Sequence, residues 1–234
     1  MRRIVKLLLS RLGYKIIPEE RFLGSYSPSC PLLEPREITD LEALYNISLS
    51  IPGMISPKSG QMLYTLCVFQ KTPGDVVEIG SWQGRSTSFL ARAVSDSSNG
   101  KFFAIDHFKG NVGKESEYVV GASDLSDLKE NFQSNIARIG LAETVEVMDM
   151  DNVRAARELE ECSVRFLFID GDHSYEGVKK DLQLFVPKLC PGAIIVFDDY
   201  SKNFPGLLVA VDEFLTETKA SRLMTYENTL VVLL

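Results

Sequence analysis

Residues 166–200 contain two apolar runs, FLFI and AIIVF, and aspartates follow each run directly. Neither run alternates with polar residues, so both are expected to be strands that are buried on both faces of a sheet. The stretch between them predicts an amphipathic helix followed by a turn at Pro191 and Gly192. Two strands joined through a helix run parallel, so their carboxyl ends lie at the same edge of the sheet.

The aspartates that follow the two strands are therefore expected to lie close together. They are Asp170, Asp172, Asp198 and Asp199, with His173 among them. Two carboxylates about 4 Å apart repel each other by roughly 4 kcal/mol at an effective dielectric near 20. A divalent cation or shared protons must relieve this repulsion. Carboxylate ligands favour a hard ion such as Mg²⁺.

The alternation of strand and helix extends over most of the chain. Further strands are predicted at 75–80, 101–106 and 144–149, helices at 38–49, 59–70, 86–94, 127–139, 153–160 and 210–216, and a closing hairpin at 222–226 and 230–234. This pattern predicts an α/β fold with a Rossmann-like, doubly wound, mostly parallel sheet of seven strands. We expect a C-terminal antiparallel hairpin and helices on both faces. Residues 1–50 are interpreted as a helical appendage and linker, and residues 51–234 as the catalytic domain.

Charge and cysteine content exclude several classes of function. The net charge of −7 argues against general nucleic-acid binding, which requires a basic face. The four cysteines are scattered without a CxxC pair and the chain has two histidines, so a structural zinc site is not expected. Reduced thiols indicate a cytoplasmic protein.

The N-terminal segment MRRIVKLLLSRLGYKIIP resembles a signal peptide only superficially. Lys6 and Arg11 interrupt its apolar run, and no cleavage site of small residues follows. It is predicted to be an amphipathic helix that packs on its own domain or on a second subunit, as in a homodimer. Peripheral contact with a membrane surface is a less favoured alternative. No segment has the length of a transmembrane span.

A glycine-containing turn follows the strand at 75–80, in the sequence VVEIGSWQGRSTSFL. Glu78, Gly80 and Gly84 lie where this strand gives way to a helix, and glycines there let a ligand approach the backbone closely. The spacing is GxxxG rather than the GxGxxG of dinucleotide-binding folds. A ligand without a pyrophosphate is therefore favoured, although a tight turn that binds no ligand remains an alternative.

Polar residues at other strand ends are candidates for the same site. Asp106 ends the second strand, at the position where doubly wound folds bind ribose hydroxyls. The stretch from Asp149 to Asn152 ends the third strand and is either the border of an adenine site or a solvated acidic loop. His173 is either a structural histidine or a general base near the cation. Asp181, within the following helix, is interpreted as a surface or capping charge.

Together these motifs resemble those of class I S-adenosylmethionine-dependent methyltransferases. Within that class, EIGxxxG, DGDHSYEG and PGAIIVFDDY are similar to segments of the divalent-metal-dependent O-methyltransferases. The strongest resemblance is to the macrocin and mycinamicin sugar O-methyltransferases, and a more distant one is to catechol and caffeoyl-CoA O-methyltransferases. The resemblance extends from about residue 52 to residue 234.

The resemblance implies roles for individual residues. S-adenosylmethionine would be bound by Ser56, Glu78, Gly80, Ser81, Ser86, Asp106, Asp149 and Asn152. Mg²⁺ or another hard divalent ion would be bound by Asp170, Asp198 and Asp199. His173 would be the general base beside Asp170. The catechol-type enzymes have Asn at the position of Asp199, which favours the comparison with the sugar-type enzymes.

The expected function is thus magnesium-dependent transfer of a methyl group to a hydroxyl of a sugar, polyol or glycosylated small molecule. The loop at 108–126 is a candidate substrate lid. Two alternatives remain at this stage. One is a metal-independent N- or C-methyltransferase, and the other is a nucleotide-binding protein without catalytic activity.

Overall fold

The computed structural model describes residues 35–110, 127–218 and 220–234. The compact unit described below begins at Leu41. The predicted amphipathic helix near the N-terminus, Cys30 and most of the candidate lid lie outside the described residues. The boundary proposed at residue 50 therefore stays a prediction.

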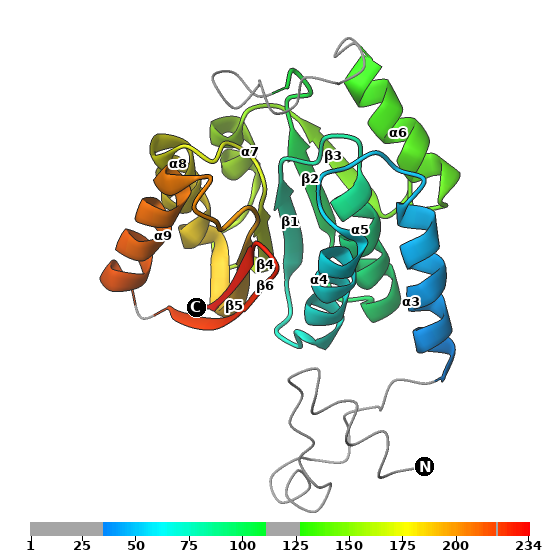
Figure 1. Cartoon of the computed structure of the whole chain (residues 1–234), viewed down its shortest axis with the longest axis horizontal. Coiled ribbons are helices and arrows are strands. Elements are labelled where there is room, and N and C mark those ends of the chain that lie inside the picture. The colour runs from blue at the N-terminus through cyan, green and yellow to red at the C-terminus, as the bar shows by residue number, and fades with distance from the viewer. Residues whose placement is uncertain (1–34, 111–126, 219) are drawn as a thin grey trace, which may run out of the picture. The chain divides into compact units, whose positions relative to one another are not determined.

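A seven-stranded sheet runs through the centre of this unit (Figure 1). Its strands are β1 (Asp75–Ile79), β2 (Phe102–Asp106), β3 (Val145–Asp149), β4 (Val164–Ile169), β5 (Leu189–Phe197), β6 (Ser221–Tyr226) and β7 (Thr229–Leu233). They lie in the order β3-β2-β1-β4-β5-β7-β6. The first five strands pair in parallel, whereas β7 pairs antiparallel with both β5 and β6. The predicted parallel sheet and its C-terminal hairpin are confirmed.

Helices cover both faces of the sheet, as predicted (Figure 1). They are α3 (Pro35–Ser48), α4 (Pro57–Phe69), α5 (Arg85–Ser97), α6 (Leu128–Arg138), α7 (Asn152–Glu158), α8 (Tyr175–Phe185) and α9 (Pro205–Glu217), with a short 3₁₀ turn, η3, at Val186–Lys188. Strand β4 shows the reason for two layers. Phe166 and Phe168 pack in the apolar layer with α4, α5 and α6, whereas Leu167 and Ile169 pack with α7, α8 and α9. A strand with apolar residues at every position needs helices on both sides.

The Pro191–Gly192 pair does not form the predicted turn between helix and strand. It lies inside β5, which begins at Leu189. The pairing of β4 with β5 jumps from Val164↔Leu189 to Phe166↔Ile194, so β5 has extra residues at this point. Proline and glycine are tolerated in a strand where such an irregularity interrupts the ladder of hydrogen bonds. The prediction of a turn was therefore wrong, although the strand after it was correct.

A buried arginine joins the amino-terminal ends of the strands, opposite the carboxyl edge. Arg165, in β4, is 0% exposed. Its guanidinium donates hydrogen bonds to the carbonyl oxygens of Cys67 (2.7 Å), Gly74 (3.0 Å) and Asn99 (3.1 Å). The first carbonyl lies in the last turn of α4, the second directly precedes β1, and the third follows α5. One side chain thus supplies hydrogen-bond donors to three separate loop ends.

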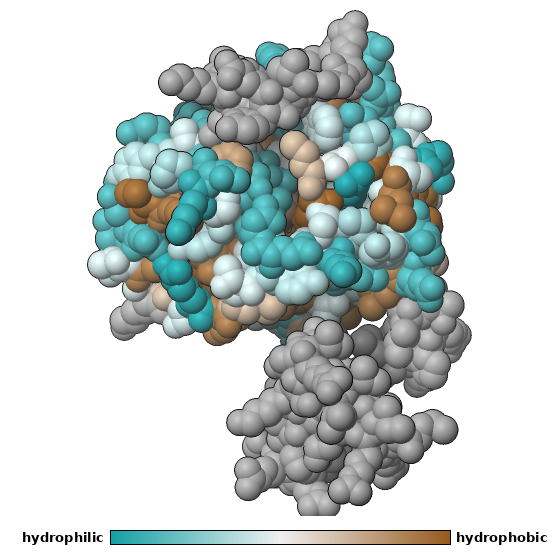
Figure 2. Space-filling model, viewed as in Figure 1, coloured by the Kyte–Doolittle hydropathy of each residue, from teal (hydrophilic) through white to brown (hydrophobic). Residues whose placement is uncertain are grey.

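The surface in Figure 2 is mostly hydrophilic, with hydrophobic residues scattered over it. Exposed apolar side chains include Met54, Phe69 and Val209. Single side chains of this kind are ordinary on a protein surface. Among the described helices, none is both long and apolar enough to cross a membrane.

Candidate functional site

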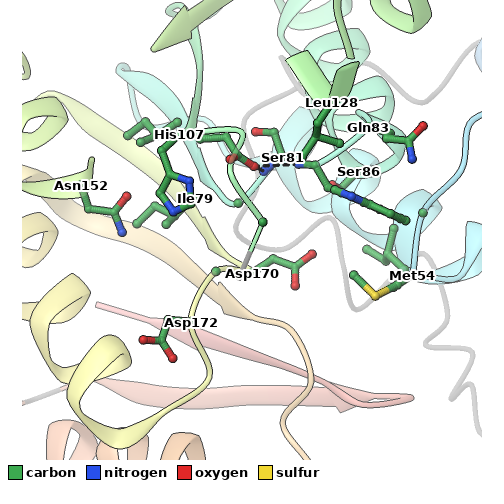
Figure 3. A pocket seen from close by; sticks show the side chains of 18 of the residues that line it. Met54, Ile79, Ser81, Gln83, Ser86, His107, Leu128, Asn152, Asp170 and Asp172 are labelled. Carbon is green, nitrogen blue, oxygen red and sulfur yellow. Dashed lines mark hydrogen bonds between the residues drawn. The ribbon is translucent and has the colours of Figure 1, made fainter. Parts of the chain in front are cut away.

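A cavity of about 320 Å³ lies at the carboxyl ends of β1, β2 and β4. This volume is within the range of small-molecule sites, which is about 300–1,000 Å³. Its walls come from the turn after β1, the residues after β2 and β4, the start of α7, one face of α8 and the segment 52–55. Figure 3 shows Asp170 near the centre of the cavity, with Asn152 on one side and Met54 on the other. The predicted site residues Gly80, Ser81, Ser86, Asp106, Asn152 and Asp170 all line it.

The turn after β1 requires glycine. Gly80 has φ of +85°, and a Cβ atom at this position would lie 2.2 Å from the carbonyl oxygen of Asp170. The ends of β1 and β4 can approach each other this closely only because residue 80 lacks a side chain. Gly84, with φ of +94°, precedes the first residue of α5. The backbone thus reaches the cavity and turns into a helix whose amino terminus points toward it.

Asp106 holds this turn in place. Its Oδ2 accepts hydrogen bonds from the backbone N–H groups of Ser81 and Trp82, each at 2.9 Å. Its Oδ1 accepts one from the N–H of Phe108 at 2.7 Å. A carboxylate has about four lone-pair sites, so most of its capacity is already used by the backbone. Asp106 lines the cavity, but its role toward ribose hydroxyls stays a prediction.

Glu78 is a buried acid behind the turn. It is 0% exposed, and burial raises the pKa of its carboxyl to about 7, against the hydrogen bond from Thr87 that favours the ionised form. Glu78 Oε1 and the neighbouring Ser81 Oγ are buried without a hydrogen-bond partner among the described residues. Unsatisfied buried polar atoms cost about 1–3 kcal/mol each. Of the two residues only Ser81 lines the cavity, so its Oγ favours a ligand with a polar group.

Replacing Glu78 with glutamine is expected to change how stability depends on pH. The pKa of Glu78 rises from about 4.5 to about 7 on folding, so the folded state binds more protons between these values. Wild-type stability therefore falls as pH rises through this window, by roughly 3 kcal/mol relative to Glu78→Gln. Urea unfolding at pH 4.5 and pH 7.5 measures the difference. The exposed control Glu158→Gln should keep the wild-type pH dependence. If the stability of Glu78→Gln changed with pH as much as that of the wild type, the raised pKa of Glu78 would be contradicted.

Asn152 and Asp181 form a polar pair in the cavity wall. Asn152 Nδ2 donates a hydrogen bond of 2.6 Å to Asp181 Oδ1. Asp181 is 3% exposed, and burial raises the pKa of its carboxyl to about 6. The interpretation of Asp181 as a surface or capping charge was wrong. It shares the buried face of α8 with Val178, Leu182 and Phe185, and this i, i+3, i+4 spacing was the signal in the sequence.

Asp149 and Ser56 lie outside the lining of the cavity. Lys129 Nζ pairs with Asp149 Oδ2 at 2.7 Å. Ser56 caps α4, since its hydroxyl accepts the backbone N–H of Ser59 at 3.0 Å. The Ser56 hydroxyl also donates to Glu227 Oε2. A direct contact of either residue with a cofactor thus stays a prediction.

Arg85 holds the segment 52–55 against the cavity. Its guanidinium donates to the carbonyl oxygens of Ile51 (2.8 Å), Gly53 and Ile55 (3.2 Å). A Cβ atom at Gly53 would lie 2.5 Å from the Cβ of Arg85, so the segment packs closely on this side chain. The sequence interpretation missed this role, because nothing near Arg85 in the chain indicates its three acceptors.

The acid cluster lies beside the cavity at the ends of β4 and β5. Burial, followed by the charges of Asp170 and Asp199, raises the pKa of Asp198 to about 8. Burial raises the pKa of Asp170 to about 6. Thr229 Oγ1 donates to Asp198 Oδ1 at 2.9 Å, and Asn228 Nδ2 donates to Asp199 Oδ1. The carboxylates are thus near enough to oppose each other's ionisation.

The cluster has the ligand chemistry of a hard cation. Carboxylate oxygens suit Mg²⁺, and each of the three acids contributes one carboxylate. In the described ranges, none of the three forms an ion pair with lysine or arginine. No group of three or more acidic, histidine or cysteine side chains in those ranges has the geometry of a formed metal site. The residues fit a magnesium ion chemically, but the side chains would have to move to bind it.

His173 lies between the cluster and α9. It is 8% exposed, and its Nε2 lies 3.6 Å from Asp170 Oδ1. Its ring packs on that of Phe204, with centroids 4.7 Å apart. The side chain is thus held by packing on one side and by a carboxylate on the other, which is compatible with either a structural role or a role in proton transfer.

Comparison with known families decides the class of the protein. A methyltransferase-domain family matches residues 77–200, more than half of the chain. The chain belongs to this methyltransferase family. The predicted enzyme class is therefore confirmed. The match spans the turn after β1, Asp106, the wall formed by α7 and α8, and the acid cluster.

Curated relatives are 26% identical to this methyltransferase over the aligned residues. One is the 8-demethyl-8-(2,3-dimethoxy-alpha-L-rhamnosyl)-tetracenomycin-C 4'-O-methyltransferase of Streptomyces olivaceus. It is 26% identical over 215 residues, which are 85% of this chain and 78% of that protein. Another is the uncharacterized protein y4gI of Sinorhizobium fredii, 26% identical over 166 residues. That match covers 67% of this chain, but the chain spans only 17% of the length of y4gI.

Solved O-methyltransferases share the fold of this methyltransferase. The enzyme of Bacillus cereus in complex with S-adenosylhomocysteine (SAH) has a TM-score of 0.59 and 21% identity, covering 88% of this chain and 93% of that one. TomG of Streptomyces achromogenes, in complex with S-adenosylmethionine (SAM), has a TM-score of 0.57 and 17% identity, covering 93% and 99%. The predicted resemblance to class I O-methyltransferases and the Rossmann-like fold are confirmed.

Proposed function

We propose that this methyltransferase transfers a methyl group from SAM to a hydroxyl of a sugar, polyol or glycosylated small molecule, with the help of Mg²⁺. The negative charge of the cavity is the main support for SAM as the cofactor. Among the described residues, five carboxylates line the cavity (Asp106, Asp151, Asp170, Asp172 and Asp181), against the cations of Arg85 and Lys180. SAM has a sulfonium and an ammonium group, which suit this negative wall, whereas a dinucleotide pyrophosphate would be repelled.

The chain's own residues would bind and orient the reactants. The turn from Gly80 to Gly84 offers backbone groups to the cofactor, Asp106 fixes that turn, and segment 52–55 excludes water from one side. When bound, SAM supplies an electrophilic methyl group and Mg²⁺ supplies a Lewis acid for the acceptor oxygen. Alignment of two reacting groups can contribute about 7–11 kcal/mol.

The residues of the acid cluster would prepare the acceptor hydroxyl. Asp170, Asp198 and Asp199 would bind the cation, and this removes the repulsion among their carboxylates. His173 Nε2, which lies 3.6 Å from Asp170 Oδ1, would take the proton of the hydroxyl. A general base of this kind contributes about 10²–10⁴-fold in rate.

The sugar-type acceptor is supported by the tetracenomycin relative, whose name describes 4'-O-methylation of a rhamnosyl compound. The presence of Asp199 also favours the sugar-type resemblance over the catechol type. We further propose a cytoplasmic enzyme that acts on small molecules rather than nucleic acid, because the chain is acidic and its cysteines are scattered. A homodimer, or peripheral membrane contact through the first helix, would depend on residues outside the described ranges.

Calorimetry with SAH and with NAD⁺ tests the cofactor. We expect SAH to bind and NAD⁺ not to bind. The negative wall of the cavity would repel a pyrophosphate, and the turn after β1 lacks the third glycine of the GxGxxG pattern. Methylation of candidate glycosides with SAM and Mg²⁺, followed by mass spectrometry, tests the reaction, and chelation with EDTA should stop it. Turnover that resists EDTA would reject the metal step. Absence of SAH binding would favour a protein without methyltransferase activity.

A further inference from the structure

Three consecutive residues at the tip of the C-terminal hairpin contact two parts of the molecule beside the cavity, the start of α4 and the acid cluster. Glu227 Oε2 accepts hydrogen bonds from the hydroxyls of Ser56 and Ser59, the latter at 2.7 Å. Asn228 and Thr229, the next two residues, donate to Asp199 and Asp198. The partners of Glu227 are 171 and 168 positions away in the chain.

The two serines follow the segment that covers the cavity, at the N-cap and in the first turn of α4. Residues 52–55 line the cavity, and Ser56 follows directly as the N-cap of α4. Met54 in this segment is 65% exposed, whereas Ile55 is 4% exposed and packs in the core. Arg85 binds the carbonyl oxygens of Ile51, Gly53 and Ile55. Glu227 binds the next residue, Ser56, so loss of this contact would release Ser56 from the hairpin.

The backbone at Glu227 has a conformation that two-residue hairpin turns require and that favours glycine. Its φ is +51°, in the left-handed region that a residue with a Cβ adopts less readily than glycine. Glycine would form this turn more easily. The pairing of Tyr226 with Thr229 already closes the hairpin, so the turn itself does not require a carboxylate. Local strain of this kind is compatible with a functional contact of the side chain.

We propose that Glu227 is a positioning residue for cofactor binding, which acts through Ser56 and Ser59 on segment 52–55. With its two neighbours, it makes the hairpin tip the element that ties the cover of the cavity to the carboxylates of Asp198 and Asp199. The inference rests on the proposed function, because it assumes that the cavity binds SAM. Glu227 itself would not touch the cofactor, since it does not line the cavity.

The test is the dissociation constant of SAH, measured by calorimetry on the full chain. Glu227→Ala is expected to weaken binding about tenfold, whereas Glu227→Gln, which retains an acceptor oxygen, should restore part of this loss. The control Glu143→Ala removes an exposed acid outside the cavity lining and should leave the constant unchanged. Ser59→Ala should weaken binding less in the Glu227→Ala background than in wild type, because the two residues act through the same contact.

The possible outcomes separate this inference from the proposed function. If wild type does not bind SAH, both are overturned. If wild type binds SAH and Glu227→Ala binds it equally well, only the positioning role is overturned. Additive effects of Glu227→Ala and Ser59→Ala would also overturn it. So would a lower melting temperature of the unliganded Glu227→Ala protein together with unchanged SAH affinity, because that combination indicates a structural role alone.

Discussion

Replacing Asp198 with asparagine is expected to raise the stability of the metal-free protein and to remove its stabilisation by Mg²⁺. In the wild type, burial and the charges of Asp170 and Asp199 oppose ionisation of Asp198. Because the pKa of Asp198 is raised to about 8, its carboxyl must take up a proton on folding at neutral pH, whereas asparagine is neutral in the folded and the unfolded state. Asparagine also keeps nearly the same shape, and its Oδ1 can still accept the hydrogen bond from Thr229. The metal-free variant should therefore melt at a higher temperature than the metal-free wild type.

The magnesium-bound state should respond in the opposite direction. A ligand present at 100 times its dissociation constant stabilises the folded state by about 2.7 kcal/mol. Loss of an outer-sphere partner lowers metal affinity by roughly 10–100-fold. Loss of a carboxylate that binds the ion directly should lower the affinity for Mg²⁺ by at least as much. Little of the stabilisation by Mg²⁺ would then remain in Asp198→Asn. The rate of methyl transfer by this variant should fall as well, because less of the protein would hold the ion.

Melting curves with EDTA and with excess Mg²⁺ measure both effects. Glu217→Gln, which removes an exposed acid on α9, is the matched control and should behave as the wild type does. A wild-type protein whose melting temperature does not respond to Mg²⁺ would contradict the metal site. The metal-independent alternative would then be preferred, with the cofactor cavity unaffected.

The second large effect is expected at the opposite edge of the sheet. Replacing Arg165 with methionine should lower the free energy of unfolding by about 3–5 kcal/mol, because the carbonyl oxygens of Cys67, Gly74 and Asn99 lose their hydrogen-bond donor. This is a large part of the roughly 5–15 kcal/mol by which a typical domain is stable. Arg165→Lys should recover only a part, since an ammonium group cannot reach three separate carbonyls as the planar guanidinium does.

Urea unfolding of Arg165→Met tests this expectation, with Arg157→Met as the control. Arg157 is exposed on α7, so its loss should change stability by no more than about 0.5 kcal/mol. The folded fraction of Arg165→Met should still bind SAH, because the cavity lies at the other ends of the strands. A loss of less than about 1 kcal/mol would mean that water satisfies the carbonyl oxygens.

The fold could be predicted because its signals are local. Continuous apolar runs identified the parallel strands, and the acids after β4 and β5 showed which edge of the sheet holds the polar groups. Glycine at position 80 indicated a close approach to the backbone, which was predicted for a ligand and which the structure shows for the carbonyl oxygen of Asp170. Each of these features depends on a few consecutive residues, which a linear pattern records.

The details of the site could not be predicted in the same way. Asp181 was misinterpreted because a single carboxylate in a helix is usually exposed, and only the packing of α8 on the cavity buries it. The Pro191–Gly192 pair was expected to form a turn, but the neighbouring strand accommodates it as an irregularity of β5. In both cases the deciding contact comes from another element.

By itself, the sequence determined the α/β class, the order of the elements, the carboxyl edge as the place where the acids gather and the resemblance to methyltransferases. Only the tertiary structure decided that Arg165 joins three loop ends, that Arg85 holds the cavity's cover and that Glu227 contacts Ser56 across 171 positions. Apolar periodicity specifies which face of an element is buried. It does not specify which distant backbone or side-chain group satisfies a buried polar atom, because that choice depends on how the elements pack together.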